Sequence, residues 1–375
     1  MKFFRLAKES VKFVLLTIFF AVIISLTVTA QESFKENFYD RTLRLTYSIF
    51  GDSTSCKANF NGWSIIDGWS GKKKALDICH KESDMMVLIT DKATKRIIYR
   101  NSYSSLFCEW QTMCFNLSSG EFKEGVMIPF PKHPSIVSVI RNYKSGLKQT
   151  LLDLEIDLEK LSDIPSVNKR YPVESLQRAK TSRSIDIVFL PEGYTAKEMD
   201  KFLEAAQKMA TQLFEYEPFS NYKRCFNINA VLAPSPESGI DIPSENIERK
   251  TLMDFSYDTF GIERYIGTSN YWSVSELASN TSWSYAIILV NSEKYGGGGI
   301  YNFYSVFPGG NSQILELFVH EFGHAFAALD DEYEEPGNAL VPLGESNRDC
   351  IMKTLSTHYY CGECKKKVES VIKRR

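Results

Sequence analysis

The sequence is poor in several features that assign other proteins to a class directly. Its net charge is −2, so it has no excess of positive charge, and nothing in it indicates nucleic-acid binding. After residue 30 no apolar run is long enough to cross a bilayer. The glycine run Gly296–Gly299 lacks the lysine and the following serine or threonine of a phosphate-binding loop, and it precedes a predicted strand instead of a helix. Histidine is rare, with five in 375 residues, so a patterned histidine pair is informative.

What is present is an ordinary globular composition, with 43% hydrophobic and 24% charged residues. The length of the chain allows two domains with sizeable cores. Aromatic residues reach 13%, which suits a chain with a large β component.

Residues 1–30 have the three-part pattern of a secretory signal peptide. A basic start is followed by an apolar run over residues 13–28 and by the small residues Val28, Thr29 and Ala30. The alternative is an uncleaved anchor, because the run approaches the length that spans a bilayer. We expect cleavage, and therefore a secreted or exported protein, periplasmic or extracellular, with no stable membrane span. The cleavage point has no cysteine, which argues against a lipoprotein.

Eight cysteines occur in the chain, and an even number in an exported protein favours disulfides. Cys361 and Cys364 form a CxxC motif near the C-terminus. A zinc knuckle would need a second pair of ligands, and Cys350 and His358 are the nearby candidates. The sequence therefore favours disulfides and leaves a structural zinc as the alternative.

Short apolar runs broken by turn residues fill residues 31–143, and they predict an N-terminal β-sandwich domain. The clearest runs are TLRLTYSIF (42–50), MMVLIT (85–90), RIIYRNSY (96–103) and MIPFPKHPSIVSVIR (127–141). Residues 144–182 are polar and weakly patterned, so we predict a linker that packs on the surface.

Residues 183–375 alternate strand and helix patterns, which predicts a second domain of α/β type with a mixed sheet. The expected strands are 185–194, 226–234, 285–292 and a strand after the glycine hairpin within 295–308. Thr195 and Glu198 stand at capping-box spacing before a helix that runs to about Phe214. The chain as a whole is therefore expected to be α+β.

The stretch LELFVHEFGHAFAAL has helical periodicity and carries two histidines four residues apart. His320 and His324 project from one face of such a helix and can share a tetrahedral ion. Glu321 lies one step round the helix, beside a water on that ion and not on the ion itself. This HExxH pattern is typical of zinc peptidases, with the glutamate as general base.

Two adjacent acids, Asp330 and Asp331, are candidates for a third metal ligand. If the helix ran straight on, Asp331 would lie about 16 Å along its axis from His320, too far for one zinc. The helix must therefore stop after His324, and the chain must turn back. In metzincin-type sites the third ligand stands six residues past the second histidine, which here is Asp330. That count also expects glycine at position 327, where this chain has alanine, so both aspartates stay open.

Several segments together resemble the IgA peptidase family of secreted zinc metalloendopeptidases. They are FLPEGYTAKEMDKF (189–202), YEPFSNY (216–222), FNINAVLAPSPESGIDIP (226–243), HEFGHAFAALDDEY (320–333), NRDCIM (347–352) and YCGEC (360–364), together with YRNSYSSLFCEWQ (99–111), which is similar to the family's N-terminal β domain. The resemblance covers nearly the whole chain after residue 30. It implies a metzincin-like zinc-peptidase domain, a catalytic Zn²⁺ ion, and protein or peptide substrates.

In that family the stretch after HEFGH ends in a small residue followed by Asp-Glu-Tyr, which aligns the family's aspartate with Asp331. The resemblance thus implies that His320, His324 and Asp331 hold the metal, with Asp330 as the alternative. The family often has glycine where this chain has Ala328, and a left-handed conformation at an alanine costs about 1 kcal/mol.

Two further roles are predicted, the first of them from the resemblance. Met352 would belong to a methionine turn that packs beneath the histidines without binding metal. Tyr333 is nominated as an oxyanion or substrate contact, against the plainer interpretation of a packing aromatic. The predicted strand within 301–306 is expected to pair with extended substrate by strand addition.

The predicted function is hydrolysis of peptide bonds by a zinc-activated water, with Glu321 as general base. The alternative is a non-catalytic exported binding protein with a vestigial metal site, and the intact Glu321 argues against it. A gluzincin-type peptidase would need a glutamate on a downstream helix, and no suitable one precedes the cysteines. Neither the physiological substrate nor the oligomeric state is specified by any motif.

Overall fold

The computed structural model describes residues 34–79, 82–113, 119–161, 164, 170–181, 184–312, 314–332 and 349–373. The predicted signal peptide, residues 1–30, lies outside the described residues. Within them, no helix combines the length and the apolar character that crossing a membrane requires. The fold is α+β, as expected, with several sheets of which one is mixed.

Two antiparallel sheets make up the N-terminal region. The first has the order β2–β1–β5 and the second the order β4–β3–β6–β7. Their strands are β1 (Phe38–Gly51), β2 (Cys56–Asp67), β3 (Met85–Asp91), β4 (Ile97–Tyr103), β5 (Gly120–Pro131), β6 (Ser135–Asn142) and β7 (Lys148–Ile156). The strands expected at 42–50, 85–90, 96–103 and 127–141 are thus confirmed, the last as two strands.

Both sheets contribute to one hydrophobic core, because their strands alternate between buried and more exposed side chains. Strand β6 shows this simply, since every second residue from Ser135 to Arg141 is buried. The ring of Tyr99 in β4 packs edge-on against Phe38 in β1 and against Trp69, with ring centroids 6.3 and 5.9 Å away. Aromatic contacts therefore join the two sheets.

Residues 144–182, expected to be a surface linker, carry two strands. β7 (Lys148–Ile156) closes the second N-terminal sheet, and β8 (Val173–Gln177) forms one edge of the next sheet. The prediction of a linker is wrong for these two segments. Their apolar alternation is weakened by polar and charged residues on the exposed side, which is common for strands at a sheet edge.

The second half of the chain forms a six-stranded mixed sheet with the order β12–β13–β11–β9–β10–β8. Its remaining strands are β9 (Ile185–Glu192), β10 (Phe226–Val231), β11 (Tyr285–Val290), β12 (Gly298–Ile300) and β13 (Tyr304–Pro308). The four central strands are parallel, whereas β8 and β12 run antiparallel to their neighbours. β12 and β13 form a hairpin, but Gly298 and Gly299 lie in its first strand, whereas a glycine hairpin was expected before the strand.

The described α-helices are α2 (Leu106–Met113), α3 (Leu158–Leu161), α4 (Met199–Leu213), α5 (Phe219–Tyr222), α6 (Tyr271–Ala278), α7 (Ile314–Ala327) and α8 (Gly362–Lys373). The predicted capping box precedes α4, where the Thr195 N–H donates to Glu198 Oε2 over 2.9 Å. Short 3-10 helices occupy several of the connections.

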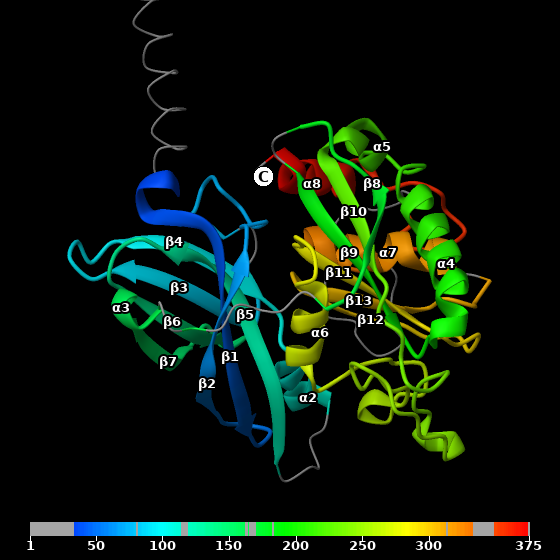
Figure 1. The fold of residues 1–375 in the computed structure, drawn as a ribbon, viewed down its shortest axis with the longest axis horizontal. Helices are drawn as coiled ribbons and strands as arrows, with labels where there is room; N and C mark the ends of the chain where they lie inside the picture. The colour runs from blue at the N-terminus through cyan, green and yellow to red at the C-terminus, as the bar shows by residue number, and fades with distance from the viewer. Residues whose placement is uncertain are drawn as a thin grey trace, which may run out of the picture.

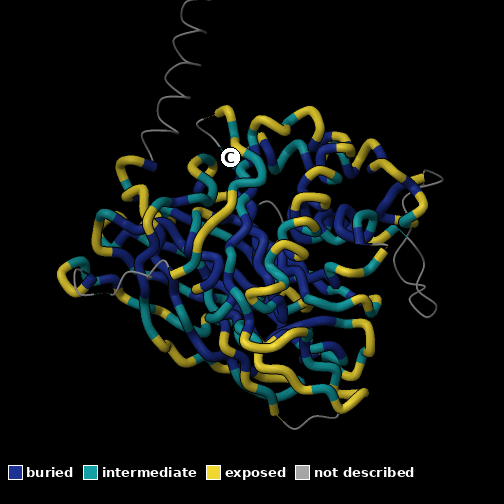
Figure 2. Tube along the Cα trace, turned by 45° about the vertical axis from the view of Figure 1, so that its right-hand side comes forward, coloured by how far each residue is buried: buried dark blue, intermediate teal, exposed yellow. Residues whose placement is uncertain are grey.

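The mixed sheet is buried on both faces, because its central strands are apolar throughout. Ile187 and Phe189 of β9 pack in a cluster with α4, α7 and α8, whereas Val188 and Leu190 pack with α6 and the N-terminal region. Helix α6 lies between β5 and the mixed sheet (Figure 1). Buried segments run through the centre of the molecule, and exposed residues lie around them (Figure 2).

An aromatic row orients α7 against the mixed sheet. Phe318, Phe322 and Phe326 are spaced four residues apart and are buried. Their rings have aromatic partners at centroid distances of 5.6, 5.6 and 5.1 Å, which are Phe307, Phe219 and Tyr285 respectively. The opposite side of α7, which carries the two histidines, therefore points away from the sheet.

A buried carboxylate links β5 to both α2 and α6. Glu124 accepts hydrogen bonds from Ser105 Oγ over 2.6 Å and from the Phe107 N–H over 3.2 Å, at the start of α2. Tyr47 OH donates to its second carboxylate oxygen over 3.2 Å, and Trp272 Nε1 of α6 donates to its backbone carbonyl over 2.7 Å. Burial raises the pKa of Glu124 to about 7, although these hydrogen bonds act in the opposite direction.

We expect Glu124 to make the stability of the protein depend on pH. Its pKa in the folded state is about 7, above the ordinary value of 4.5, so the folded protein keeps a proton that the unfolded chain releases. The contribution, at most about 3 kcal/mol, is fully present below about pH 4.5 and is lost as the pH rises through about 7. Thermal unfolding between about pH 5 and about pH 8 measures it.

The variant Glu124→Gln should flatten this pH dependence. Glu121→Gln, at an exposed glutamate on the same strand, is the control and should keep the wild-type slope. Equal slopes for the wild type and Glu124→Gln would contradict the assignment.

Candidate metal centre

The chain reverses direction directly after α7. The helix ends at Ala327, and Ala328 adopts a left-handed conformation with a φ of 49°. The Ala328 N–H donates to the His324 carbonyl over 3.0 Å, which is the αL type of helix C-cap. Glycine is favoured at such a position, because a Cβ makes this conformation unfavourable by about 1 kcal/mol. The reversal brings Asp331 back beside the helix, which a straight helix would not allow.

Three side-chain atoms meet at this reversal. His320 Nε2 and His324 Nε2 lie 3.1 Å apart, and Asp331 Oδ1 lies 3.2 Å from the first and 3.1 Å from the second. The three atoms form a nearly equilateral triangle. Ligands of a tetrahedral zinc with bonds of about 2.0–2.2 Å lie about 3.3–3.6 Å apart, so the triangle is close to the required size.

Backbone carbonyls hold the outer nitrogen of each histidine. His320 Nδ1 lies 2.9 Å from the Ile351 carbonyl oxygen, and His324 Nδ1 lies 2.6 Å from the Leu329 carbonyl oxygen. Because a carbonyl only accepts, both Nδ1 atoms carry protons, and in neutral rings both Nε2 atoms present lone pairs. Two lone pairs and a carboxylate oxygen then face one point, which a shared cation stabilises. The residues present therefore fit a metal ion.

The close approach of the two histidines and Asp331 also shifts their pKa values. Burial lowers the pKa of His320 and of His324, but the neighbouring Asp331 carboxylate raises both, and the net direction is upward. Burial raises the pKa of Asp331, but the two histidines lower it more strongly, to well below its usual range. The three groups thus favour a positive charge at their centre.

Asp330 is not part of this group. Its side chain is exposed and lies 3.8 Å from Lys367 Nζ in α8. Of the two candidate aspartates, Asp331 faces the histidines and Asp330 faces α8 and solvent. Tyr333, nominated as an oxyanion or substrate contact, lies outside the described residues.

An open cleft lies in front of the three atoms, and Glu321 lines it together with them. Its walls also include Glu109 and Met113 of α2, the glycine run Gly296–Gly299, and Lys353. A Cβ placed on Gly299 would lie 3.7 Å from Glu321 Oε2. The backbone of β12 at Gly299 therefore lies close to this carboxylate, and a small side chain there would make an ordinary van der Waals contact with it.

No sequence motif predicted that α2, from the N-terminal region, would line the cleft. Glu109 of α2 accepts a hydrogen bond from Tyr265 OH over 2.6 Å, and this contact joins the two halves of the chain at the cleft. Burial raises the pKa of Glu109, against the Tyr265 hydrogen bond. The two residues are far apart in the chain and belong to no spacing pattern, so sequence reasoning missed them.

The strand predicted to take substrate, within 301–306, does not lie at an edge. β13 (Tyr304–Pro308) is paired with β12 on one side and with β11 on the other. This prediction is wrong, because the backbone hydrogen-bonding groups of β13 already have partners on both sides. The terminal strand next to the cleft is β12, Gly298–Ile300.

Met352 packs against α7 beside the histidine pair. It is fully buried, and a Cβ placed on Gly323 would lie only 3.0 Å from Met352 Sδ. Glycine at position 323 therefore lets the methionine approach the helix between His320 and His324. The residue before the methionine, Ile351, supplies the carbonyl that holds His320.

No disulfide joins the seven described cysteines, so the structure does not support the expectation of disulfides among them. The eighth, Cys114, lies outside the described residues.

The zinc knuckle considered as the alternative does not include His358. This residue lies near Tyr216, whose OH is 3.3 Å from His358 Nδ1. Three thiols gather around a carboxylate that sequence reasoning missed, in the group Cys350, Cys361, Cys364 and Glu332.

Two family models match the chain. The model described as Peptidase M64 N-terminus matches residues 33–152, and the model described as IgA Peptidase M64 matches residues 173–346. A comparison with curated proteins finds no match. The matches define the protein class as a peptidase, a hydrolase of peptide bonds. The chain belongs to the IgA peptidase M64 family, in agreement with the resemblance of its motifs.

The left-handed turn can be tested at Ala328. A β-branched side chain is strongly disfavoured at positive φ, so Ala328→Val should displace Asp331 and weaken metal binding at least about tenfold. Ala328→Gly is the matched control, because glycine adopts this conformation without strain, and it should bind metal as the wild type does. Competition with a chelator measures the affinity. Unchanged binding by Ala328→Val would show that the turn does not position the ligand.

The packing role of Met352 gives a second test. Met352→Leu conserves volume and should keep the wild-type metal content, with a loss of stability below about 1.5 kcal/mol. Met352→Ala leaves a cavity under α7 and should lower the free energy of unfolding by about 2–5 kcal/mol. Denaturant unfolding and metal analysis give the two readouts. Loss of metal in Met352→Leu would indicate that the sulfur itself is a ligand.

Proposed function

We propose that this protein is a secreted zinc-dependent endopeptidase. The observation that carries the proposal is the triangle of His320 Nε2, His324 Nε2 and Asp331 Oδ1, which borders an open cleft. Three protein ligands with one open position are typical of catalytic zinc sites. In this proposal the third ligand is Asp331, and Asp330 has no part in the site.

Bound Zn²⁺ would supply Lewis acidity, lowering the pKa of a water in the open position and polarising the substrate carbonyl. Glu321 follows His320 in the chain and lines the same cleft. As general base it accepts the proton of the attacking water and passes it to the leaving amine. The Ile351 and Leu329 carbonyls keep both imidazoles in the tautomer that presents Nε2 to the cleft.

Extended substrate is proposed to pair with β12. This strand ends the sheet order and lines the cleft. The segment from Arg264 to Ile266 pairs with Gly297, just before the strand, and lies against Gly298. Main-chain pairing would hold the substrate without regard to its side chains. Selection among side chains then falls to the cleft walls, where Glu109 and Lys353 carry side chains of opposite charge type.

The wider arrangement is proposed to be metzincin-like, with a mixed sheet, a metal-binding helix, a reversal that ends in the third ligand, and a methionine turn at Met352. The two N-terminal sheets are proposed to form a β-sandwich, supported by their shared core. Export is proposed from the signal-peptide pattern of residues 1–30. The family implies protein or peptide substrates.

Three variants test the proposed roles, Glu321→Gln, Asp331→Ala and Asp330→Ala. Glu321→Gln should keep the metal and lose at least about 100-fold in kcat/KM, because a general base contributes about 10²–10⁴-fold. Asp331→Ala should lose activity and the metal held by His320 and His324, and Asp330→Ala should keep both. The measurements are the metal content of the purified protein and the cleavage of a mixed peptide library.

The reverse result for the two aspartate variants would make Asp330 the ligand. A wild-type protein that binds no metal and cleaves no peptide would overturn the proposal. It would leave the alternative of a non-catalytic exported binding protein.

A further inference from the structure

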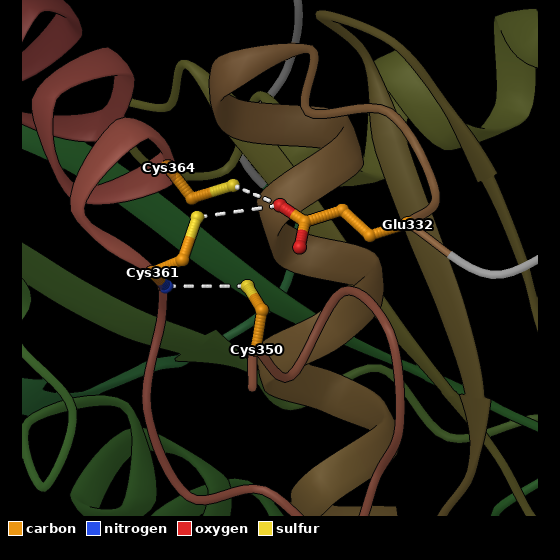
Figure 3. A group of neighbouring side chains, drawn as sticks. All are labelled: Glu332, Cys350, Cys361 and Cys364. Carbon is orange, nitrogen blue, oxygen red and sulfur yellow. Dashed lines mark hydrogen bonds between the residues drawn. The ribbon is translucent and has the colours of Figure 1, made fainter. Parts of the chain in front are cut away.

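A second group of potential metal ligands lies next to the three residues of the catalytic site. Four side chains point toward one another (Figure 3), and one ligand atom from each lies within 4.8 Å of all the others; they are Cys350, Cys361, Cys364 and Glu332. Cys361 Sγ and Cys364 Sγ lie 3.3 and 3.2 Å from the same oxygen, Glu332 Oε1. The Cys361 N–H donates to Cys350 Sγ over 3.2 Å.

This group is enclosed. The three cysteines are buried, the most exposed of them at 9%. Glu332 Oε2 is also buried, and it has no hydrogen-bond partner among the described residues. Burying a carboxylate oxygen without a partner costs about 1–3 kcal/mol or more, and thiols are weak donors that compensate poorly. A cation among the four groups would supply the missing partner.

A disulfide does not account for this arrangement. One disulfide uses two thiols, leaves the third unused, and gives the Glu332 carboxylate nothing to bind. Convergence of four ligand atoms is instead the geometry of a closed metal site. Sulfur ligands of a tetrahedral zinc with bonds of about 2.3 Å lie about 3.8 Å apart. The four ligand atoms, which all lie within 4.8 Å of one another, therefore need at most a small contraction.

We propose that these four side chains bind a second Zn²⁺ ion as a structural site. Thiolates select zinc over magnesium and calcium, which prefer oxygen ligands. With four protein ligands no position is left for water or substrate, so the site is structural and not catalytic. It goes beyond the proposed peptidase function and is independent of the metal held by the two histidines.

The surrounding backbone favours thiolates at this place. Cys364 lies in the first turn of α8 (Gly362–Lys373), and Cys361 directly precedes that helix. Both sulfurs therefore lie near the positive end of the helix dipole, which stabilises negative charge. The N–H that reaches Cys350 Sγ stabilises a thiolate in the same way.

The second ion would help to position the ligands of the catalytic site, because its own ligands belong to the segments next to them. Glu332 follows Asp331 directly, and its N–H donates to the Met352 carbonyl over 2.9 Å. Cys350 opens the turn whose next carbonyl holds His320. One ion at the cysteines thus ties three segments together: the end of the reversal after α7, the methionine turn, and the start of α8. Glu332 and the cysteines are positioning residues in this arrangement.

The first experiment measures zinc in a protein whose catalytic site cannot bind it. The full chain with His320→Ala/His324→Ala isolates the second site, and inductively coupled plasma mass spectrometry counts the zinc. We expect two ions per chain in the wild type and one in this double variant. Adding Cys361→Ser and Cys364→Ser should leave none. Adding Cys79→Ser, at a partly buried thiol outside the group, should leave one.

A spectroscopic measurement covers the case in which the cysteine variants fail to fold. Cobalt(II) is bound in place of zinc in the His320→Ala/His324→Ala protein, where the cysteines are intact. Charge-transfer absorption from sulfur to cobalt is expected, because thiolates are the principal ligands. Glu332→Gln keeps the side-chain shape but removes its charge, and it should weaken cobalt binding at least about tenfold.

The proposal is overturned if the double variant holds no zinc and shows no sulfur-to-cobalt absorption. Alkylation and intact mass would then report either three reduced thiols or a disulfide within the group, and a disulfide at Cys361 and Cys364 would mark a redox pair instead. In that event the wild type would still hold one zinc that Asp331→Ala removes. Failure of this inference is therefore distinguishable from failure of the proposed function.

Discussion

The candidate metal centre depends on one backbone constraint, the left-handed residue that ends α7. Ala328 turns the chain so that Asp331 lies beside the two histidines, where a continuing helix would carry it about 16 Å away. The same turn directs the Leu329 carbonyl to His324. Ligand position and ring tautomer are therefore set by a single conformational choice, and the packing around Gly323 stabilises it despite the unfavourable φ of an alanine.

Successive layers of packing support that turn. The central strands are buried on both faces, so the mixed sheet forms a rigid base. An aromatic row holds α7 on this base, and the turn that contains Met352 approaches the helix at Gly323. The turn also delivers the Ile351 carbonyl to His320. Each histidine is thus oriented by a carbonyl from a different loop, which makes the centre a product of tertiary structure and not of α7 alone.

Local patterns predicted much of this structure, and non-local contacts account for what they missed. The strands and the HExxH helix follow from apolar periodicity and the spacing of four residues, which are properties of short segments. Which aspartate faces the two histidines depends on the φ of Ala328. The number of residues between His324 and each aspartate does not determine this angle. Glu109 and Glu332 take their roles from partners distant in the chain. The strands within 144–182 were missed because their exposed polar residues obscure the alternation.

The hydrophobic core that runs from the N-terminal sheets to the mixed sheet has a consequence for how the protein can be regulated. The two family models divide the chain in sequence, but Val188 and Leu190 of the second half are buried with residues of the first. Detaching the first half would expose that apolar surface to water and remove the α2 wall of the cleft. We therefore expect the N-terminal half to be required in the functional protein, so that its removal should not activate it.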